Sequence, residues 1–152
     1  MYKYNETLVS GTGGILTLTD VEWDTYDISL PLGSTVDFAG SNPLNPFPVA
    51  PGVSITITMV TTANTAHSLL VKVTDGAGLP LSDALVTLAT TAAVSTKSAG
   101  PVGVGDQGQV YFGSLLATVY DLIATLSGYL SATASVTISG DTIEQVILAP
   151  GS

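Results

Sequence analysis

The chain has 152 residues, of which 45% are apolar, and three lysines with no arginine face twelve acids, giving a formal net charge of −9 at pH 7. Nucleic-acid binding relies on Lys and Arg to neutralise phosphates, so this composition excludes a nucleic-acid partner and argues against an anionic membrane surface. Disulfides, zinc-thiolate sites and thiol nucleophiles are excluded because the chain has no cysteine.

The first 65 residues show short runs with a period of two, which is typical of strands. The run "VSITITMV" (53–60) alternates apolar side chains with Ser and Thr, and this predicts a half-buried strand. Clusters of Gly, Pro and Asn such as "AGSNPLNP" (39–46) end these runs, since such residues favour turns. No stretch of the chain reaches the roughly 18 to 20 consecutive apolar residues of a membrane span.

A polar run, "TTANTAHS" (61–68), offers no side chains for a core and predicts a short boundary between two modules in contact. After it, the same period of two returns in several short runs, and no segment has the period of a helix. Many short strands separated by turns predict an all-β fold of two small tandem antiparallel β-sandwich modules, with a small barrel as the alternative. The strands expected in the second module lie within 69–75, 84–90, 120–126, 132–139 and 141–148.

Two segments of the chain share one skeleton, "GILTLTDVEWDTYDI" (14–28) and "GQVYFGSLLATVYDL" (108–122), at a constant offset of 108 − 14 = 94 residues. A glycine permits a turn, two alternating apolar residues face a core, and a Tyr-x-Ile/Leu pair re-enters a strand. We therefore interpret residues 1–65 as a partial module that lacks two opening strands, and 66–152 as a complete one. The matching positions are Gly14, Leu16, Leu18, Val21, Tyr26, Asp27 and Ile28 with Gly108, Val110, Phe112, Leu115, Tyr120, Asp121 and Leu122.

The second module also has an opening segment, "VTDGAGLPLSDALVTL" (73–88), and a later one, "SGYLSATASVTI" (127–138). With the skeleton around Tyr120, residues of about 68–149 resemble the carboxypeptidase regulatory-like domain family, with a partial copy in 1–63. The resemblance implies a seven-stranded transthyretin-like or immunoglobulin-like β-sandwich. It also implies a non-catalytic module of a secreted or cell-surface protein. The positions that carry it include Asp75, Gly78, Pro80, Leu81, Ala84, Val86, Leu88, Gly128 and Tyr129.

Three sets of side chains are candidates for chemistry. Four acids, Asp20, Glu22, Asp24 and Asp27, could converge on Ca²⁺, which takes six to eight oxygen ligands, but on a strand the first three would only share the solvent side. Trp23, Tyr111 and Tyr129 could stack on a sugar, or pack into a core or interface. The lone His67 lies in the boundary run, and no G-x-S-x-G elbow is present, so no catalytic residue, cofactor or enzyme activity is expected.

An incomplete sandwich exposes sheet edges and an apolar face, which proteins usually cover. The cover could be the second module, a neighbouring subunit, or strands of a longer tandem protein from which this chain comes. We therefore expect a non-catalytic extracellular structural protein, a subunit or spacer of a cell-surface filament that self-associates through strands and apolar faces. The alternative is a carbohydrate-binding or Ca²⁺-binding module of a larger exported protein. The expected contact residues are Tyr2, Tyr4, Leu8, Val53, Ile55 and Ile57.

Overall fold

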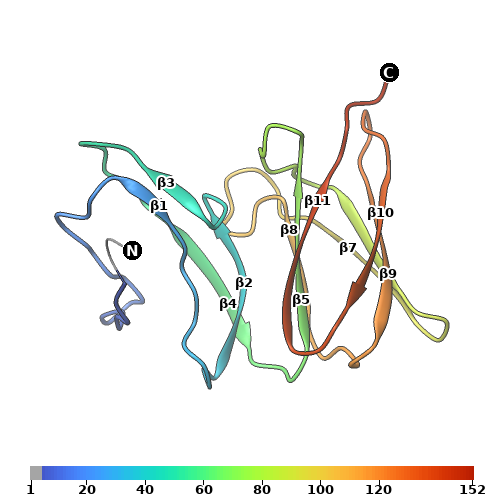
Figure 1. Cartoon of the computed structure of the whole chain (residues 1–152), viewed down its shortest axis with the longest axis horizontal. Coiled ribbons are helices and arrows are strands. Elements are labelled where there is room, and N and C mark those ends of the chain that lie inside the picture. Colours follow the sequence, from blue (N-terminus) through green and yellow to red (C-terminus); the bar gives the residue numbers. More distant parts are fainter. Residues whose placement is uncertain (1–4) are drawn as a thin grey trace.

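The computed structural model describes residues 5–152, which form strands and loops only (Figure 1). Among these residues there is accordingly no helix of the length and apolarity needed to cross a membrane. The all-β prediction is confirmed. The strands are β1 (Asp24–Tyr26), β2 (Val36–Asn42), β3 (Phe47–Val49), β4 (Thr58–Ala63), β5 (Ser68–Thr74), β6 (Leu85–Ala89), β7 (Val94–Ser98), β8 (Gln109–Phe112), β9 (Val119–Thr125), β10 (Ala132–Thr137) and β11 (Asp141–Ile147).

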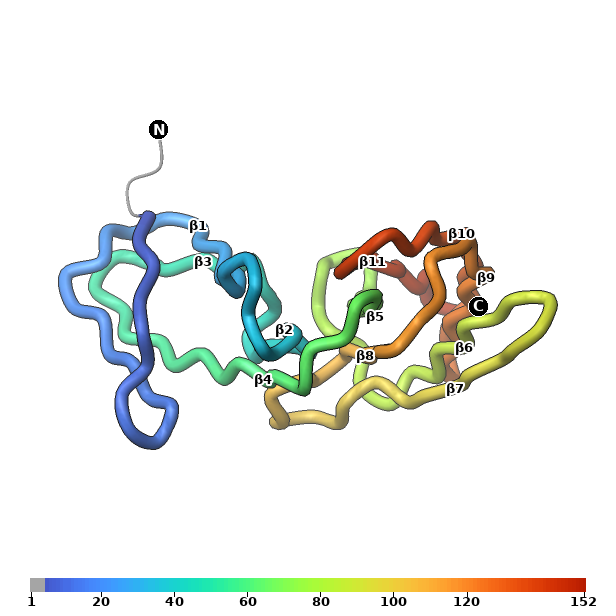
Figure 2. Tube along the Cα trace, turned by 90° about the horizontal axis from the view of Figure 1, so that it is seen from below, coloured from blue at the N-terminus to red at the C-terminus, as the bar shows by residue number. Residues whose placement is uncertain are grey.

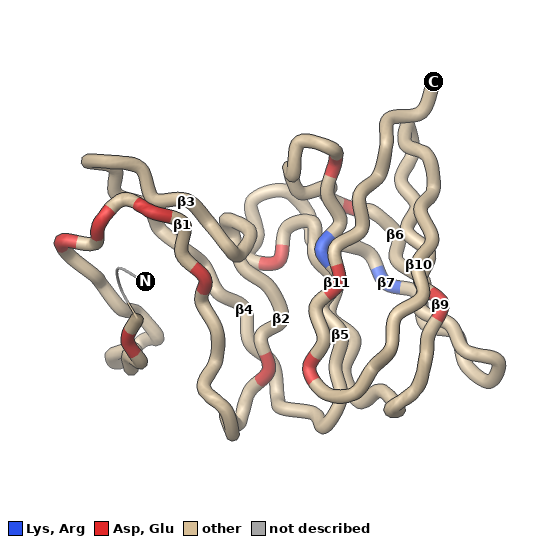
Figure 3. Tube along the Cα trace, viewed as in Figure 1, with Lys and Arg blue, Asp and Glu red and all other residues tan. Residues whose placement is uncertain are grey.

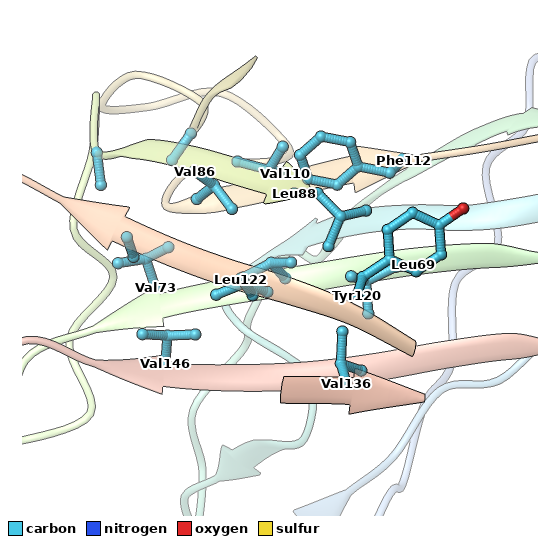
Figure 4. Close-up of a cluster of buried hydrophobic side chains, with 14 of the residues drawn as sticks. Leu69, Val73, Val86, Leu88, Val110, Phe112, Tyr120, Leu122, Val136 and Val146 are labelled. Atoms are coloured by element: carbon cyan, nitrogen blue, oxygen red, sulfur yellow. The ribbon is translucent and has the colours of Figure 1, made fainter. Parts of the chain in front are cut away.

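The second module is a sandwich of two sheets with the strand orders β11-β5-β8 and β10-β9-β6-β7. Its strands alternate inward and outward residues, as β9 does with Tyr120, Leu122 and Ala124 buried and the residues between them exposed. The two inner faces meet in one apolar core (Figure 4), in which Leu69, Val71, Val86 and Leu122 have no exposed surface. The predicted β-sandwich is therefore present in this half of the chain.

One pairing differs from the antiparallel sheets expected from the sequence. β11 pairs with β5 in parallel over the register Asp141↔Ser68 to Ile147↔Thr74. The cause is the crossing from β10, which belongs to the other sheet, to β11, since a strand that changes sheets can enter beside β5 in the same direction.

The first module consists of two antiparallel ribbons, β1 with β3 and β2 with β4, and has almost no core of its own. Of its described apolar residues only Ala39 and Phe47 are buried. Figure 2 shows the segments that precede β1 and that connect β3 to β4 on the side of this module away from the second module. Because so little apolar surface is buried within this module, its order depends on contacts with the second module.

The strand predicted over 53–60 forms only from Thr58 onward. β4 pairs with β2 through Asn42↔Thr58, and no described strand lies beside the residues before it. The alternating sequence from Val53 to Ile57 is suited to an extended conformation. It does not become a strand, because no neighbouring strand in the described part of the chain hydrogen bonds to it.

The two copies of the skeleton share a tyrosine that bonds to a residue four positions upstream, but they do not share their strands: residues 14–18 form no strand, whereas the matching segment contains β8. The hydroxyl of Tyr26 donates to the main-chain O of Glu22 at 2.7 Å, and the hydroxyl of Tyr120 accepts from the main-chain N of Leu116 at 3.0 Å, four residues upstream in each case. However, β9 pairs with β6 and β10, whereas β1 pairs with β3. The first module therefore does not repeat the sheet arrangement of the second, because without opening strands β1 has no equivalent of β6 beside it.

Candidate functional site

The main concave feature of the first module is a groove of about 1070 Å³, which we call the open groove. The segments 14–18, 20–23 and 49–59 line it, together with Tyr26 and Phe47. Large apolar side chains that line this groove are exposed to solvent, with exposed fractions of 72% for Ile15 and 63% for Trp23. The other exposed apolar residues that line it are Leu16, Leu18, Val53, Ile55 and Met59. A continuous exposed apolar surface of this kind marks an interaction site.

The main chain on one side of the open groove is available for pairing. Val53–Ile57 alternates apolar and hydroxyl side chains, and within residues 5–152 no strand pairs with it. The neighbouring segment around Ile15 forms a tight turn through the main-chain bonds Gly11 N to Ile15 O and Gly14 N to Gly11 O and then continues without a strand partner among the described residues. An extended peptide laid in the groove would find both apolar side chains and main-chain groups to bind.

Among the described residues that line the open groove, there are acids and no base. Asp20 and Glu22 line it, while Lys72 and Lys97 both belong to the second module. Figure 3 shows acids distributed over both modules and both described lysines within the second. A binding segment that is apolar and uncharged or basic would suit this charge distribution better than an acidic one.

The two modules are joined by a buried carboxylate. Asp37 of β2 is 2% exposed, and it accepts hydrogen bonds from the Asn64 amide at 2.8 Å, from Thr65 N at 3.0 Å and from Thr65 Oγ1 at 3.1 Å. The hydroxyl of Tyr111 on β8 donates to the same carboxylate. The polar run predicted as a boundary is therefore tied to the first module by its side chains.

A buried amide makes a second tie across the joint. Gln109 of β8 is 1% exposed, and its Nε2 donates to Ser41 O at 2.8 Å while its Oε1 accepts from Ser41 N at 3.1 Å. The amide thus pairs with the main chain of β2 as a neighbouring strand would. Close packing surrounds this contact, since a Cβ built on Gly105 would come within 2.6 Å of Val60 Cγ2.

Acid should weaken this joint through Asp37. Burial alone would raise the pKa of Asp37, but hydrogen bonds from Tyr111, Thr65 and Asn64 outweigh it and hold the pKa below its usual value. The stability gained from the ionised form is therefore complete above the unfolded value of about 4 and is lost as the pH falls through the lower folded pKa. Urea unfolding followed by Trp23 fluorescence gives the free energy of unfolding at each pH. The amount by which Asp37→Asn lowers this free energy, relative to the unmodified chain, should shrink below about pH 4. A deficit that stays constant down to pH 2 would contradict this.

The structure does not bring the four candidate Ca²⁺ ligands together as one group. Among residues 5–152 there is no group of three or more potential ligands that could hold a metal ion. The Asp24 carboxylate accepts from Thr25 N at 2.8 Å, and that of Asp27 accepts from Asn45 Nδ2 at 2.6 Å, while Asp20 and Glu22 line the open groove.

The three candidate sugar-stacking aromatics lie in three different places. Trp23 lines the open groove, Tyr111 is half-buried at the joint, and Tyr129 is half-buried near Pro150 at the far end of the second module. They form no common surface, so the shared stacking platform is not present. Tyr111 is held at the joint because its hydroxyl donates a hydrogen bond to the buried carboxylate of Asp37.

The predicted contact residues divide between described and undescribed parts of the chain. Tyr2 and Tyr4 lie outside the described residues. Val53, Ile55 and Ile57 line the open groove, with Ile57 half-buried, and Leu8 is 40% exposed. Sequence reasoning missed Asp37, Asn45 and Gln109, the buried polar residues of the joint. The only signal for Asp37 was an acid inside the otherwise weakly polar run "VDFAGSN".

No family model matches the chain, and no curated protein matches it. Among solved structures, the Bacillus anthracis TIE protein is similar over 62% of this chain with 14% identity and a TM-score of 0.47, and this chain covers 19% of it. The Caf1A usher C-terminal domain, whose surface hydrophobic clusters are important for F1 antigen assembly, is similar over 56% of this chain and 99% of its own length, with 18% identity and a TM-score of 0.34. Membership of the carboxypeptidase regulatory-like domain family stays a prediction.

Proposed function

We propose that this chain is a non-catalytic structural subunit or spacer of an extracellular filament, in which the open groove receives an extended segment of a second copy as an added strand. The observation that supports this is the groove itself, where exposed Ile15, Trp23 and Ile55 adjoin a Val53–Ile57 segment with no strand partner in the described part of the chain. An added strand would pair with the main chain of this segment and would also cover the exposed apolar side chains. Main-chain hydrogen bonds give affinity, and alternate side chains of the added strand fill the apolar surface.

The segment that we propose as the inserted strand is the N-terminal one. On a strand, every second residue would share one face, and here these residues are Tyr2, Tyr4, Glu6 and Leu8. The described residues 5–10 of this segment are exposed throughout. The segment carries one base, Lys3, and one acid, Glu6, so it adds no net charge beside a groove lined by Asp20 and Glu22. A contact between two different surfaces of the same chain is head-to-tail, and such contacts propagate into open filaments unless the rotation closes a ring.

Two blocked variants test this proposal. Ile55→Lys places a charge in the open groove, and Leu8→Lys places one in the proposed inserted strand. We expect the unmodified chain to form polymers by sedimentation and negative-stain microscopy, and each variant alone to remain monomeric. An equal mixture of the two variants should form heterodimers and nothing longer, because one intact groove and one intact strand remain per pair.

The matched control is Ile123→Lys. Ile123 lies on the outer face of β9 and is 40% exposed, compared with 37% for Ile55, but it is outside the open groove. This variant should polymerise as the unmodified chain does. Loss of polymers in Ile123→Lys, an unmodified chain that stays monomeric, or an unaffected Ile55→Lys variant would refute assembly through the groove.

A further inference from the structure

The N-terminal segment carries an acceptor signal for an N-linked glycan. Residues 5–7 are Asn5, Glu6 and Thr7, which fit the pattern Asn-x-Thr with a middle residue other than proline. In exported proteins, an oligosaccharide is transferred to the side-chain amide of the asparagine in such a signal. The signal lies well before the first described strand, which begins at Asp24.

The other three asparagines of the chain lack this signal. Proline follows both Asn42 and Asn45, and the second residue after Asn64 is Ala66. Their amides also take part in the fold. The side-chain nitrogen donates a hydrogen bond of 2.9 Å in Asn42, of 2.6 Å in Asn45 and of 2.8 Å in Asn64. Asn5 is therefore the one asparagine whose sequence context suits glycan transfer.

Asn5 and Thr7 are accessible in the folded chain. Residues 5–10 are exposed throughout, and none of them belongs to a strand. A main-chain turn, in which Gly11 N donates to Ile15 O at 2.9 Å, separates them from the lining of the open groove. An enzyme that modifies a side chain must enclose the main chain on both sides of it, and an exposed segment outside the sheets permits this.

The two residues of the signal share one face of an extended segment. Side chains alternate with a period of two, so Asn5 and Thr7 lie on the same side, and Glu6 and Leu8 lie on the other. The second of these faces is the one that we propose to enter the open groove. A glycan on Asn5 would therefore point away from the groove when the segment is inserted.

We propose that Asn5 carries an N-linked oligosaccharide, which is added before the segment is inserted into a neighbouring copy. The Nδ2 atom of Asn5 attacks C1 of a sugar that is joined to a lipid pyrophosphate. The Nδ2–C1 bond forms, and the bond between C1 and the phosphate oxygen breaks. Nδ2 gives one proton to a base of the transferase, and the lipid pyrophosphate leaves with the electron pair of the broken bond. No oxidant or reductant takes part.

The glycan would add hydration to a chain that carries little charge. Only 10% of the residues are charged, and the open groove exposes large apolar side chains such as Ile15 and Trp23. A glycan is bulky and hydrophilic, so it would keep the N-terminal segment in solvent before assembly and would cover the outer face of the inserted strand afterwards. This inference rests on the extracellular location in the proposed function, and not on the groove.

The first test is transfer in vitro to the folded full chain, with a purified oligosaccharyltransferase and a lipid-pyrophosphate-linked oligosaccharide. The acceptor is the Ile55→Lys variant, whose blocked groove makes the result independent of filament formation. We expect the intact mass to rise by one oligosaccharide and the peptide map to place it on Asn5. Adding Asn5→Gln or Thr7→Val should abolish this rise, whereas Thr7→Ser should keep it, because a serine hydroxyl also completes the signal.

Ala66→Thr is the matched control, since it gives Asn64 the same signal within the joint. Asn64 is also exposed, but its main-chain N donates to Thr35 O at 3.1 Å and its Nδ2 donates to Asp37 Oδ1 at 2.8 Å. The folded variant should therefore gain no second oligosaccharide. Transfer to Asn64 as complete as that to Asn5 would overturn the argument from the accessible N-terminal segment.

The second test is the peptide map of the chain purified from the cells that produce it. Hydrolysis of the bond between the glycan-bearing Nδ2 and Cγ by a glycan-specific amidase should leave aspartate at position 5 and asparagine at the other three positions. An absence of transfer to Asn5 in vitro, or an unmodified Asn5 in the natural chain, would overturn the proposal. Neither result depends on whether the chain polymerises, so the assembly experiment is decided separately.

Discussion

Replacing Asp37 with alanine should lower the free energy of unfolding of the first module by about 3 kcal/mol. The substitution removes the acceptor of four hydrogen bonds at a buried position, from Asn64, Thr65 N, Thr65 Oγ1 and Tyr111. Donors left without an acceptor cost more than the bonds themselves contributed. The module has little core to compensate for this loss.

Trp23 is the only tryptophan of the chain and lies in the first module, so its fluorescence in a urea titration reports on that module. Tyr111→Phe removes one of the four bonds and should cost about 1 kcal/mol. Asp121→Ala, at an exposed acid of β9, should change the free energy of unfolding by less than about 0.5 kcal/mol. An Asp37→Ala midpoint equal to that of Asp121→Ala would show that the carboxylate does not hold the joint.

Gly108→Ala should destabilise the second module by about 3 kcal/mol. Gly108 has a φ of +67°, and a Cβ placed there would lie 2.5 Å from Pro80 Cβ and 3.0 Å from Leu81 N. The main chain on both sides is fixed, because Gly108 N donates to Gly100 O at 3.0 Å and Gly108 O accepts from Val73 N at 2.8 Å. Neither the alanine nor its neighbours can move without breaking these bonds.

Gly128→Ala separates the two causes of this destabilisation, which are the left-handed main-chain conformation and the close contact with Pro80. Gly128 has a similar φ of +83°, but a Cβ there would meet nothing within 4 Å. It should therefore show only the cost of the left-handed conformation, about 1 kcal/mol. Hydrogen exchange of β5 and β9 measures both variants. Equal destabilisation by the two variants would show that the contact with Pro80 contributes nothing.

Period-two sequence patterns predicted five strands of the second module closely, because each of these strands has a partner and a buried face. They did not predict β7 (Val94–Ser98), whose residues are all exposed. The run 132–139 contains β10 (Ala132–Thr137), and 84–90 contains β6 (Leu85–Ala89). The same pattern failed over 53–57, where the residues are suited to a strand but the described chain offers no partner. Local sequence specifies extended conformation, and pairing depends on the rest of the fold.

The site was predictable only in part. The apolar alternation of Val53, Ile55 and Ile57 predicted an exposed contact surface, and these residues line the open groove. The joint was not predictable, because Asp37 and Gln109 are residue types that usually lie at the surface. They are buried here through partners about 70 residues away, Tyr111 and Ser41, and no local pattern records such pairs.

The parallel pairing of β5 and β11 has a mechanical consequence. β5 leaves the first module at Ser68, and β11 ends at Ile147, at the opposite end of the same ladder. Tension transmitted from the first module to the residues after Ile147 would pull these two strands lengthwise past each other. The rungs from Asp141↔Ser68 to Ile147↔Thr74 would then share the load together in shear instead of opening one by one like a zipper.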